Sequence, residues 1–171
     1  IEPGAKIAND VIIGPFSYIG AEVVLQSGVE IKSHVVVTGN TEVGHSTVIY
    51  PFAVVGEIPQ DLKFNGEHTS LKIGKNNQIR ESVTINVGTA GGGGVTSISD
   101  NCLLMVGTHI AHDCRIGKNV IFANHSTLAG HVIVEDDVVV GALSAIHQFS
   151  RIGEGAMIGG MSGVTADVVP F

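Results

Sequence analysis

The sequence is short of large side chains and of charge. Among its 171 residues tryptophan is absent, aromatic residues make up 5% and charged residues 15%. Aromatic rings normally supply much of the volume of a protein core, so this interior must be built from many aliphatic side chains. The net charge of −7 argues against a general nucleic-acid-binding protein. No run of about 18 apolar residues is present, so we expect no membrane span.

Cysteine is equally scarce, since Cys102 and Cys114 are the only two. Two thiols do not make a disulfide framework, and they favour a reducing compartment. Both fall at the small inward position of the repeat described below. We therefore expect them to be packing residues, as buried free cysteines usually are.

What the sequence has in abundance is glycine, with 23 residues, and a strict six-residue period. Apolar side chains recur at every sixth position over 7–55, 73–85 and 98–164; all are aliphatic except Phe122. The residue four places later is small in every uninterrupted hexad except the one that holds Asn77. A helix has a period of 3.6 and a simple strand a period of two, so neither explains six. A short strand followed by a tight turn does.

Three such hexads close one triangular coil of 18 residues, and strand pairing stacks successive coils about 4.8 Å apart. The repeat predicts about eight coils. Two segments interrupt it: 56–72 preserves the phase, and 86–97, with the glycine run Gly91–Gly94, shifts it by one residue. Insertions into a repeat scaffold are tolerated at turns, so we expect both segments to protrude as loops.

Several of the eight histidines fall in line on such a prism. Positions 110, 128 and 146 are separated by one full coil each and therefore occupy one wall in consecutive coils. His112, His131 and His147 follow these positions within three residues, which predicts a shared edge. His109 precedes that edge, Gln148 lies beside His147, and segment 86–97 should leave the prism one coil earlier. We expect the remaining histidines to be surface residues: His34, His45, His68 and His125.

This edge has three interpretations: solvated surface, metal site or catalytic site. Imidazole is a common zinc ligand. However, His109 and His112 are only three residues apart across a turn, and no cysteine or acidic cluster completes a tetrahedral site. General-base chemistry fits better, because Asp113 follows His112 directly and can orient its ring. We therefore predict no metal and no cofactor.

Six segments carry a resemblance to a known family: Pro59–Gly66, Ile79–Ile85, Asn101–Met105, His109–Cys114, Leu128–His131 and Ile146–Phe149. Over nearly its whole length the sequence resembles the bacterial UDP-N-acetylglucosamine acyltransferases, which are hexapeptide-repeat proteins. The resemblance implies an all-β fold, the left-handed parallel β-helix. Its handedness is an exception to the right-handed crossover rule and comes from the resemblance, since the period alone does not prove it.

The resemblance also implies a reaction, the transfer of an (R)-3-hydroxyacyl group from acyl carrier protein to the 3-hydroxyl of UDP-N-acetylglucosamine at the start of lipid A synthesis. By this resemblance His112 is the general base, Asp113 orients its ring, and the Gly130 N–H stabilises the oxyanion. Gly160 matches the position that limits acyl-chain length. The other residues implied to contact substrate, the first two from a neighbouring subunit, are Asp61, Lys63, His109, His131, His147 and Gln148.

The family is a cytoplasmic homotrimer with active sites between its subunits, so the implied partners are acyl carrier protein, the sugar nucleotide and two further copies of the chain. Relatives continue into a helical C-terminal region that helps bind the nucleotide and the carrier. We therefore assign 1–171 to a β-helix domain, with the helical domain missing. Many relatives have His-Arg-Gly-Thr where this chain has Asn86-Val-Gly-Thr89, which predicts an altered contact from the second loop.

Three other functions stay open. A related N-acyltransferase of the same pathway shares the fold and a histidine base, but it has an additional N-terminal domain; Asp61 favours the hydroxyl acceptor over the amine. A hexapeptide-fold carbonic anhydrase would need a more widely spaced histidine pair than His109 and His112. The third alternative is a non-catalytic β-helix scaffold.

Overall fold

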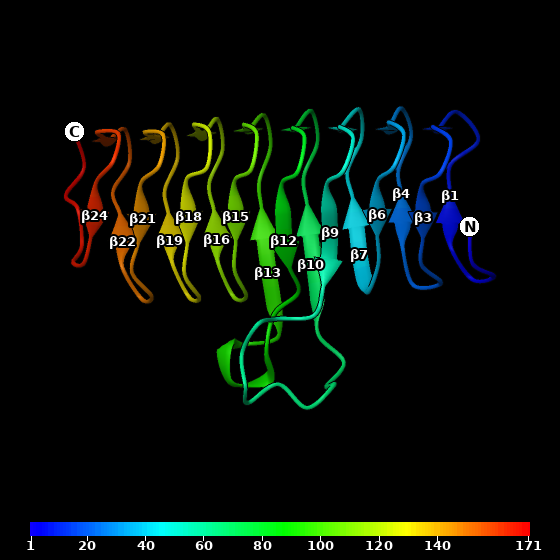
Figure 1. The fold of residues 1–171 in the computed structure, drawn as a ribbon, viewed down its shortest axis with the longest axis horizontal. Coiled ribbons are helices and arrows are strands. Elements are labelled where there is room, and N and C mark those ends of the chain that lie inside the picture. The colour runs from blue at the N-terminus through cyan, green and yellow to red at the C-terminus, as the bar shows by residue number, and fades with distance from the viewer.

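The computed structural model describes residues 1–171 and consists of 24 short strands and one turn of 3₁₀ helix, η1 (Ala90–Gly92). The strands form three parallel sheets of eight strands each, and consecutive strands belong to different sheets. Three consecutive strands therefore make one coil, and eight coils stack along the long axis (Figure 1). The prediction of an all-β parallel β-helix with about eight coils is confirmed.

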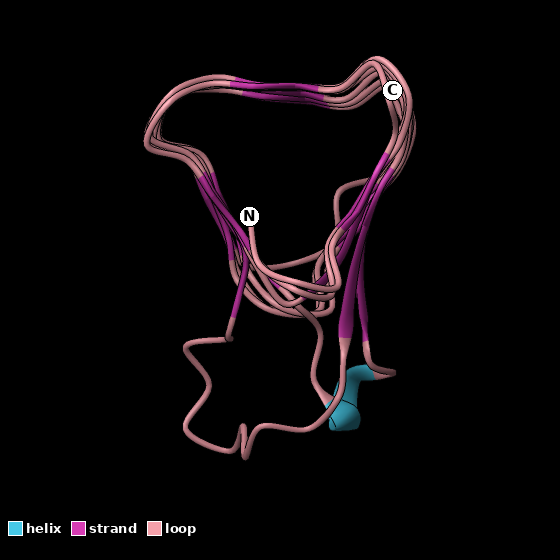
Figure 2. Cartoon of the chain, turned by 90° about the vertical axis from the view of Figure 1, so that its right-hand side faces the viewer, coloured by secondary structure: helices cyan, strands magenta, loops and turns pink.

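The three sheets are the three walls of a triangular prism (Figure 2). Sheet A contains β1 (Lys6–Ile7), β4 (Val24–Leu25), β7 (Asn40–Val43), β10 (Ser70–Ile73), β13 (Val95–Ile98), β16 (Arg115–Ile116), β19 (Ile133–Val134) and β22 (Arg151–Ile152). Sheet B contains β2 (Ile12–Ile13), β5 (Glu30–Ile31), β8 (Val48–Ile49), β11 (Gln78–Ile79), β14 (Leu103–Leu104), β17 (Ile121–Phe122), β20 (Val139–Val140) and β23 (Met157–Ile158). Sheet C contains β3 (Tyr18–Ile19), β6 (Val36–Val37), β9 (Val54–Glu57), β12 (Thr84–Asn86), β15 (His109–Ile110), β18 (Thr127–Leu128), β21 (Ala145–Ile146) and β24 (Gly163–Val164).

The core fills the inside of the prism with the large residue of every hexad. All of these side chains are buried except Ile7, Ile13 and Val164, which lie in the first and last coils and are half-buried. The one aromatic member, Phe122, is completely buried. Each apolar side chain thus packs against its equivalents in the coils above and below, which is why aliphatic residues suffice.

The small inward position also behaves as the period predicts. Cys102 and Cys114 occupy it, and both are free, buried thiols. The exception, Asn77, is fully buried there, and its amide is satisfied: Nδ2 donates to the Ser99 carbonyl (2.9 Å) and Oδ1 accepts from the Cys102 N–H (2.7 Å). A polar residue is tolerated in this core because both ends of the amide are paired.

The turns between sheets A and B carry a ladder of polar side chains. Asn76, Asn101, Asn119 and Asp137 have positive φ angles of 57–61°, a conformation that asparagine and aspartate adopt more readily than most residues. Each asparagine amide donates to the side chain one coil further along, at 3.3, 3.3 and 2.9 Å. The ladder keeps consecutive turns in register.

Both insertions leave the prism at the turn from sheet C to sheet A and lie together below that edge (Figures 1 and 2). Val43 pairs with Ile73 and Ile73 pairs with Ile98, so each of these two coils is longer than three hexads. The first is longer by two whole hexads and the second by one hexad and a single further residue, which explains the shift of phase. The ends of the predicted segments 56–72 and 86–97 are strands, so the loops proper span 58–69 and 87–94.

Candidate active site

The candidate site lies on the edge between sheets C and A, in the turns that follow β15, β18 and β21. The turn after β15 holds His112 and Asp113, and the next turn holds Gly130 and His131. Since β15 pairs with β18 and β18 with β21, these turns are stacked directly on one another. The two loops leave from the same edge one and two coils earlier, as the sequence predicted for the second of them.

Two of the predicted histidines touch, and the third does not join them. The rings of His112 and His131 meet edge to face with centroids 5.0 Å apart. The next ring in the column is Phe149, stacked on His131 at 4.4 Å and 7°. His147 is exposed, and its Nδ1 lies 3.1 Å from the Gln148 carbonyl oxygen. Sequence reasoning missed Phe149, although it lies one full coil after His131 and could have been found from that spacing.

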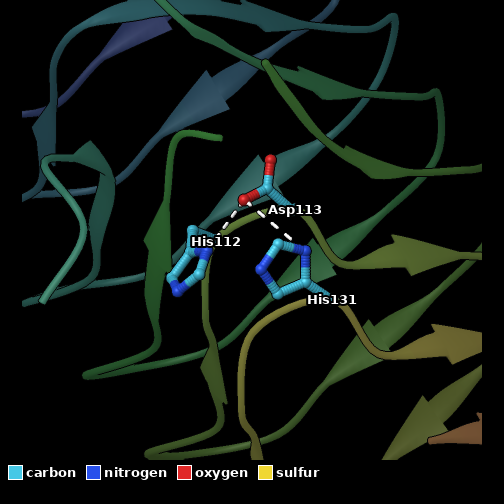
Figure 3. Close-up of side chains that lie close together, drawn as sticks. All are labelled: His112, Asp113 and His131. Atoms are coloured by element: carbon cyan, nitrogen blue, oxygen red, sulfur yellow. Dashed lines mark hydrogen bonds and ion pairs between the residues drawn. The ribbon is translucent and has the colours of Figure 1, made fainter. Parts of the chain in front are cut away.

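The central contact of the site is between His112 and Asp113. Nδ1 of His112 lies 2.8 Å from Oδ2 of Asp113, and Nδ1 of His131 lies 3.9 Å from the same oxygen (Figure 3). The His112 side chain is 15% exposed and that of Asp113 1%. Asp113 has a positive φ of 61°, and its N–H donates to Thr96 Oγ1 at 2.8 Å. The backbone of Asp113 is thus held in place by Thr96, and this fixes the position from which its carboxylate extends.

The carboxyl group of Asp113 is held in its ionised form. Burial raises its pKa, but hydrogen bonds from Thr89 and His112 lower it by more, so the pKa lies below the ordinary value of 3.8. An ionised carboxylate can only accept hydrogen bonds. The proton between the two groups therefore belongs to Nδ1 of His112, so that in the neutral form of the ring the free lone pair is on Nε2. This is the arrangement that a general base requires.

A cavity of about 470 Å³ opens between this edge and the two loops. His131, Phe149 and Thr89 line it together with Asp61 and Lys63 from the first loop of the same chain. The fold thus brings Asp61 and Lys63 to the histidine edge of their own chain, and their contribution to a neighbouring subunit's site stays a prediction. The reason is topological, because the first loop leaves at the same turn two coils earlier.

His109 lies on the outer face of sheet C, next to the edge. Its Nδ1 is 2.7 Å from Thr84 Oγ1, and burial, followed by the nearby His112, lowers its pKa below 6.5. It lines a second cavity of about 400 Å³ together with Asn86 and Ile58. The Asn86 Nδ2 donates to the carbonyls of Glu57 (3.3 Å) and Ile58 (3.1 Å), so this residue ties down the start of the first loop.

The two glycines singled out by the sequence lie on different edges. Gly130 is directly beneath His112: a Cβ added at Gly130 would lie 2.5 Å from Cε1 and 2.6 Å from Nε2 of that ring. The absence of a side chain at Gly130 thus makes room for the imidazole. Gly160 is exposed at a turn from sheet B to sheet C, away from the histidine edge.

His112, Asp113 and His131 are the residues that could hold a metal ion, since their potential ligand atoms lie within 4.8 Å of one another. The 2.8 Å separation of His112 from Asp113 is nevertheless that of a charge-assisted hydrogen bond. The arrangement in this structure is that of a proton-transfer pair.

The repeats and the fold of this chain are similar to those of known proteins. Residues 4–39 and 96–130 match the family model described as bacterial transferase hexapeptide (six repeats). These two stretches are hexapeptide repeats of the bacterial transferase type. A solved structure, that of Francisella novicida UDP-N-acetylglucosamine acyltransferase, is 40% identical, with a TM-score of 0.99 over 100% of this chain and 62% of that one. A mirror-image coil would not superpose, so the overlay confirms the left-handed β-helix.

Two curated relatives narrow the class. The acyl-[acyl-carrier-protein]–UDP-N-acetylglucosamine O-acyltransferase of Paracoccus denitrificans is 62% identical over 124 residues, which are 72% of this chain and 48% of that protein. The protein of the same name from Rhizobium johnstonii is 50% identical over 171 residues, 100% of this chain and 63% of that protein. The chain belongs to the UDP-N-acetylglucosamine acyltransferase family. It spans about half to two thirds of the length of these relatives.

Proposed function

We propose that this chain carries the catalytic centre of an O-acyltransferase that moves an (R)-3-hydroxyacyl group from acyl carrier protein to the 3-hydroxyl of UDP-N-acetylglucosamine, the first step of lipid A synthesis. The observation that carries the proposal is the hydrogen-bonded pair of His112 and Asp113 beside a cavity under two loops. The family supports the choice of donor and acceptor, because the relatives' names state both.

In the proposed reaction His112 acts as the general base. Its Nε2 takes the proton of the sugar 3-hydroxyl as that oxygen attacks the thioester carbonyl carbon. A C–O bond forms, and the carbonyl electron pair moves onto oxygen, where the Gly130 N–H stabilises the charge. When the carbonyl re-forms, the C–S bond breaks and the thiolate of the carrier takes the proton from His112. Asp113 stabilises the imidazolium during its brief lifetime.

The lining of the cavity is polar, with Lys63 as its one cation beside the carboxylates of Asp61 and Glu67. Lys63 offers a cation to a diphosphate, and Asp61 and His131 offer hydrogen-bond partners to sugar hydroxyls. We place Gln148 with His147 at the exposed rim of the same edge, where a large substrate would reach them. His109, which lines the cavity of about 400 Å³, is assigned to substrate binding as well.

A homotrimer is part of the same proposal. Exposed apolar side chains gather at the turns between sheets B and C: Phe16, Phe52, Leu143 and Met161 are 60–83% exposed. A ring of three copies pairs two different faces of each subunit. In the proposed trimer the edge between sheets B and C of one subunit packs against the histidine edge of the next. This packing covers the exposed apolar side chains and brings Gly160, which we assign to acyl-chain selection, close to the neighbour's histidines.

A cytoplasmic location is also proposed, and the buried free thiols of Cys102 and Cys114 are consistent with it. The structure has no helix with the length and apolar character needed to cross a bilayer.

The test is the variant His112→Ala, with His45→Ala as the matched control because His45 is exposed at a turn between sheets A and B. Acyl transfer from the carrier to the sugar nucleotide should fall about 10²–10⁴-fold in His112→Ala, the usual contribution of a general base, and stay unchanged in His45→Ala. A His112→Ala protein that folds and keeps wild-type activity would remove the basis of the proposal. Transfer only to a 3-amino sugar nucleotide would identify the N-acyltransferase instead.

A further inference from the structure

The second loop makes a direct contact with the catalytic pair that the proposed mechanism does not use. Thr89 donates twice to the carboxylate of Asp113, from its backbone N–H to Oδ1 (3.0 Å) and from Oγ1 to Oδ2 (2.6 Å). Oδ2 is also the oxygen that His112 contacts. Thr89 lies 24 residues before Asp113 and is 6% exposed, and its hydrogen bonds go to the carboxylate, not to Nε2 of His112, where the proton would be taken.

The loop around Thr89 is shaped to the same carboxylate. A Cβ added at Gly92 would lie 2.0 Å from Cγ of Asp113, and one added at Gly88 would lie 2.9 Å from its Oδ1. The backbone of 88–92 therefore lies against the carboxyl group with no space between them. On the other side the rings of His112 and His131 face Oδ2. Thr89 provides two of the hydrogen-bond donors to the buried negative charge of Asp113.

We propose that Thr89 is a positioning residue, which fixes the plane of the Asp113 carboxylate and through it the orientation of the His112 ring. The expected effect on the reaction rate rests on the proposed function, whereas the contact between Thr89 and Asp113 is independent of it. A carboxylate with one donor can rotate about its Cβ–Cγ bond. With both oxygens held by Thr89, Oδ2 is directed at Nδ1 of His112, and Nε2 is directed away from Asp113.

The experiment compares Thr89→Val, which keeps the shape of the side chain and removes the hydroxyl, with Thr89→Ser, which keeps the hydroxyl. We expect kcat to fall about tenfold in Thr89→Val, with KM changing less than about twofold, and Thr89→Ser to recover most of the loss; a tenfold change is about 1.4 kcal/mol. In an Asp113→Asn background the Thr89→Val change should cost no more than about a further twofold, because Thr89 acts through Asp113.

A second readout is independent of activity. The carbon-13 resonance of the Asp113 carboxyl group should titrate at higher pH in Thr89→Val than in the wild type, because a hydrogen bond to the charged form is lost. The titration of Thr89→Ser should match the wild type. Thr108→Val is the matched control: Thr108 is fully buried, and its Oγ1 donates to the Met105 carbonyl at 2.8 Å in a turn between sheets B and C, without a contact to Asp113.

The outcomes separate the two proposals. If the wild type transfers no acyl group, the proposed function fails, and the titration still decides whether Thr89 holds Asp113. An unchanged Asp113 titration in folded Thr89→Val overturns the positioning role, and so does a Thr89→Ser variant as slow as Thr89→Val. If Thr89→Val does not fold, Thr89→Ala takes its place with the same expectations.

Discussion

The substitution Gly130→Ala tests the geometry of the site with a single methyl group. The backbone at Gly130 does not have a positive φ, so alanine is allowed there and keeps the N–H assigned to the oxyanion. The new Cβ would lie 2.5–3.1 Å from three atoms of the His112 ring, whereas ordinary contacts are 3.4–4 Å. Something must move, and the ring is the freest element because His112 is 15% exposed while the turn beneath it is held by strand pairing.

The expected effect falls on activity much more than on stability. Relief of the clash requires the ring to move by about 1 Å, and a misplacement of that size can cost about 100-fold in rate. The same movement lengthens the 2.8 Å contact with Asp113. The fold should lose only about 1 kcal/mol, at the low end for overpacking, because the ring can shift toward solvent.

The assay is steady-state acyl transfer, with the melting temperature as the measure of folding. Gly163→Ala is the control, because a Cβ there meets nothing within 4 Å and the φ angle is not positive. We expect the control to keep full activity. A Gly130→Ala enzyme that works within about threefold of the wild type would refute the argument that this glycine makes room for the base.

Two further predictions concern groups whose pKa is shifted by burial. The pKa of His109 lies below 6.5 in the folded protein because of burial and the nearby His112, so the unfolded chain binds a proton first as the pH falls. The free energy of unfolding, measured with urea between about pH 7.5 and pH 5, should therefore decrease toward acid, and His109→Gln should flatten that slope; an equal slope in both proteins would contradict this. Burial raises the pKa of Cys102 to about 11 and that of Cys114 to about 12, so neither thiol should be alkylated by iodoacetamide at about pH 8 until the protein is unfolded. Rapid labelling of the native protein in mass spectra would show that these thiols are accessible.

The fold was predictable because one six-residue rule fixes every coil. Once Ile110, Leu128 and Ile146 are placed on one wall, the stacking of the following turns is determined by strand pairing alone. The same rule locates the turns where the loops leave, and the one-residue shift after Ile85 already indicates an insertion that is not a multiple of six.

Contacts that depend on individual side-chain and loop conformations could not be predicted in this way. The period places His112 above Gly130, but the approach of the His131 ring depends on the positive φ of 65° at that residue. The contact of Thr89 with Asp113 depends on the path of a glycine-rich loop, for which no periodic pattern exists. For the same reason, no pattern in the sequence decides whether Asp61 reaches the histidine edge of its own chain.

The way in which the insertions join the prism has a consequence for how such proteins can diverge. Each loop connects two neighbouring walls of the prism at the edge between sheets C and A. The strand that follows the loop pairs in register with the previous coil whatever the length of the loop, as the two insertions of unequal length show. Residues can therefore be gained or lost in the first loop, 58–69, while the strands that carry His112 and Asp113 keep their alignment. A deletion of one residue inside a strand has no such freedom, since it moves the large aliphatic residue of that hexad off the inward-facing position.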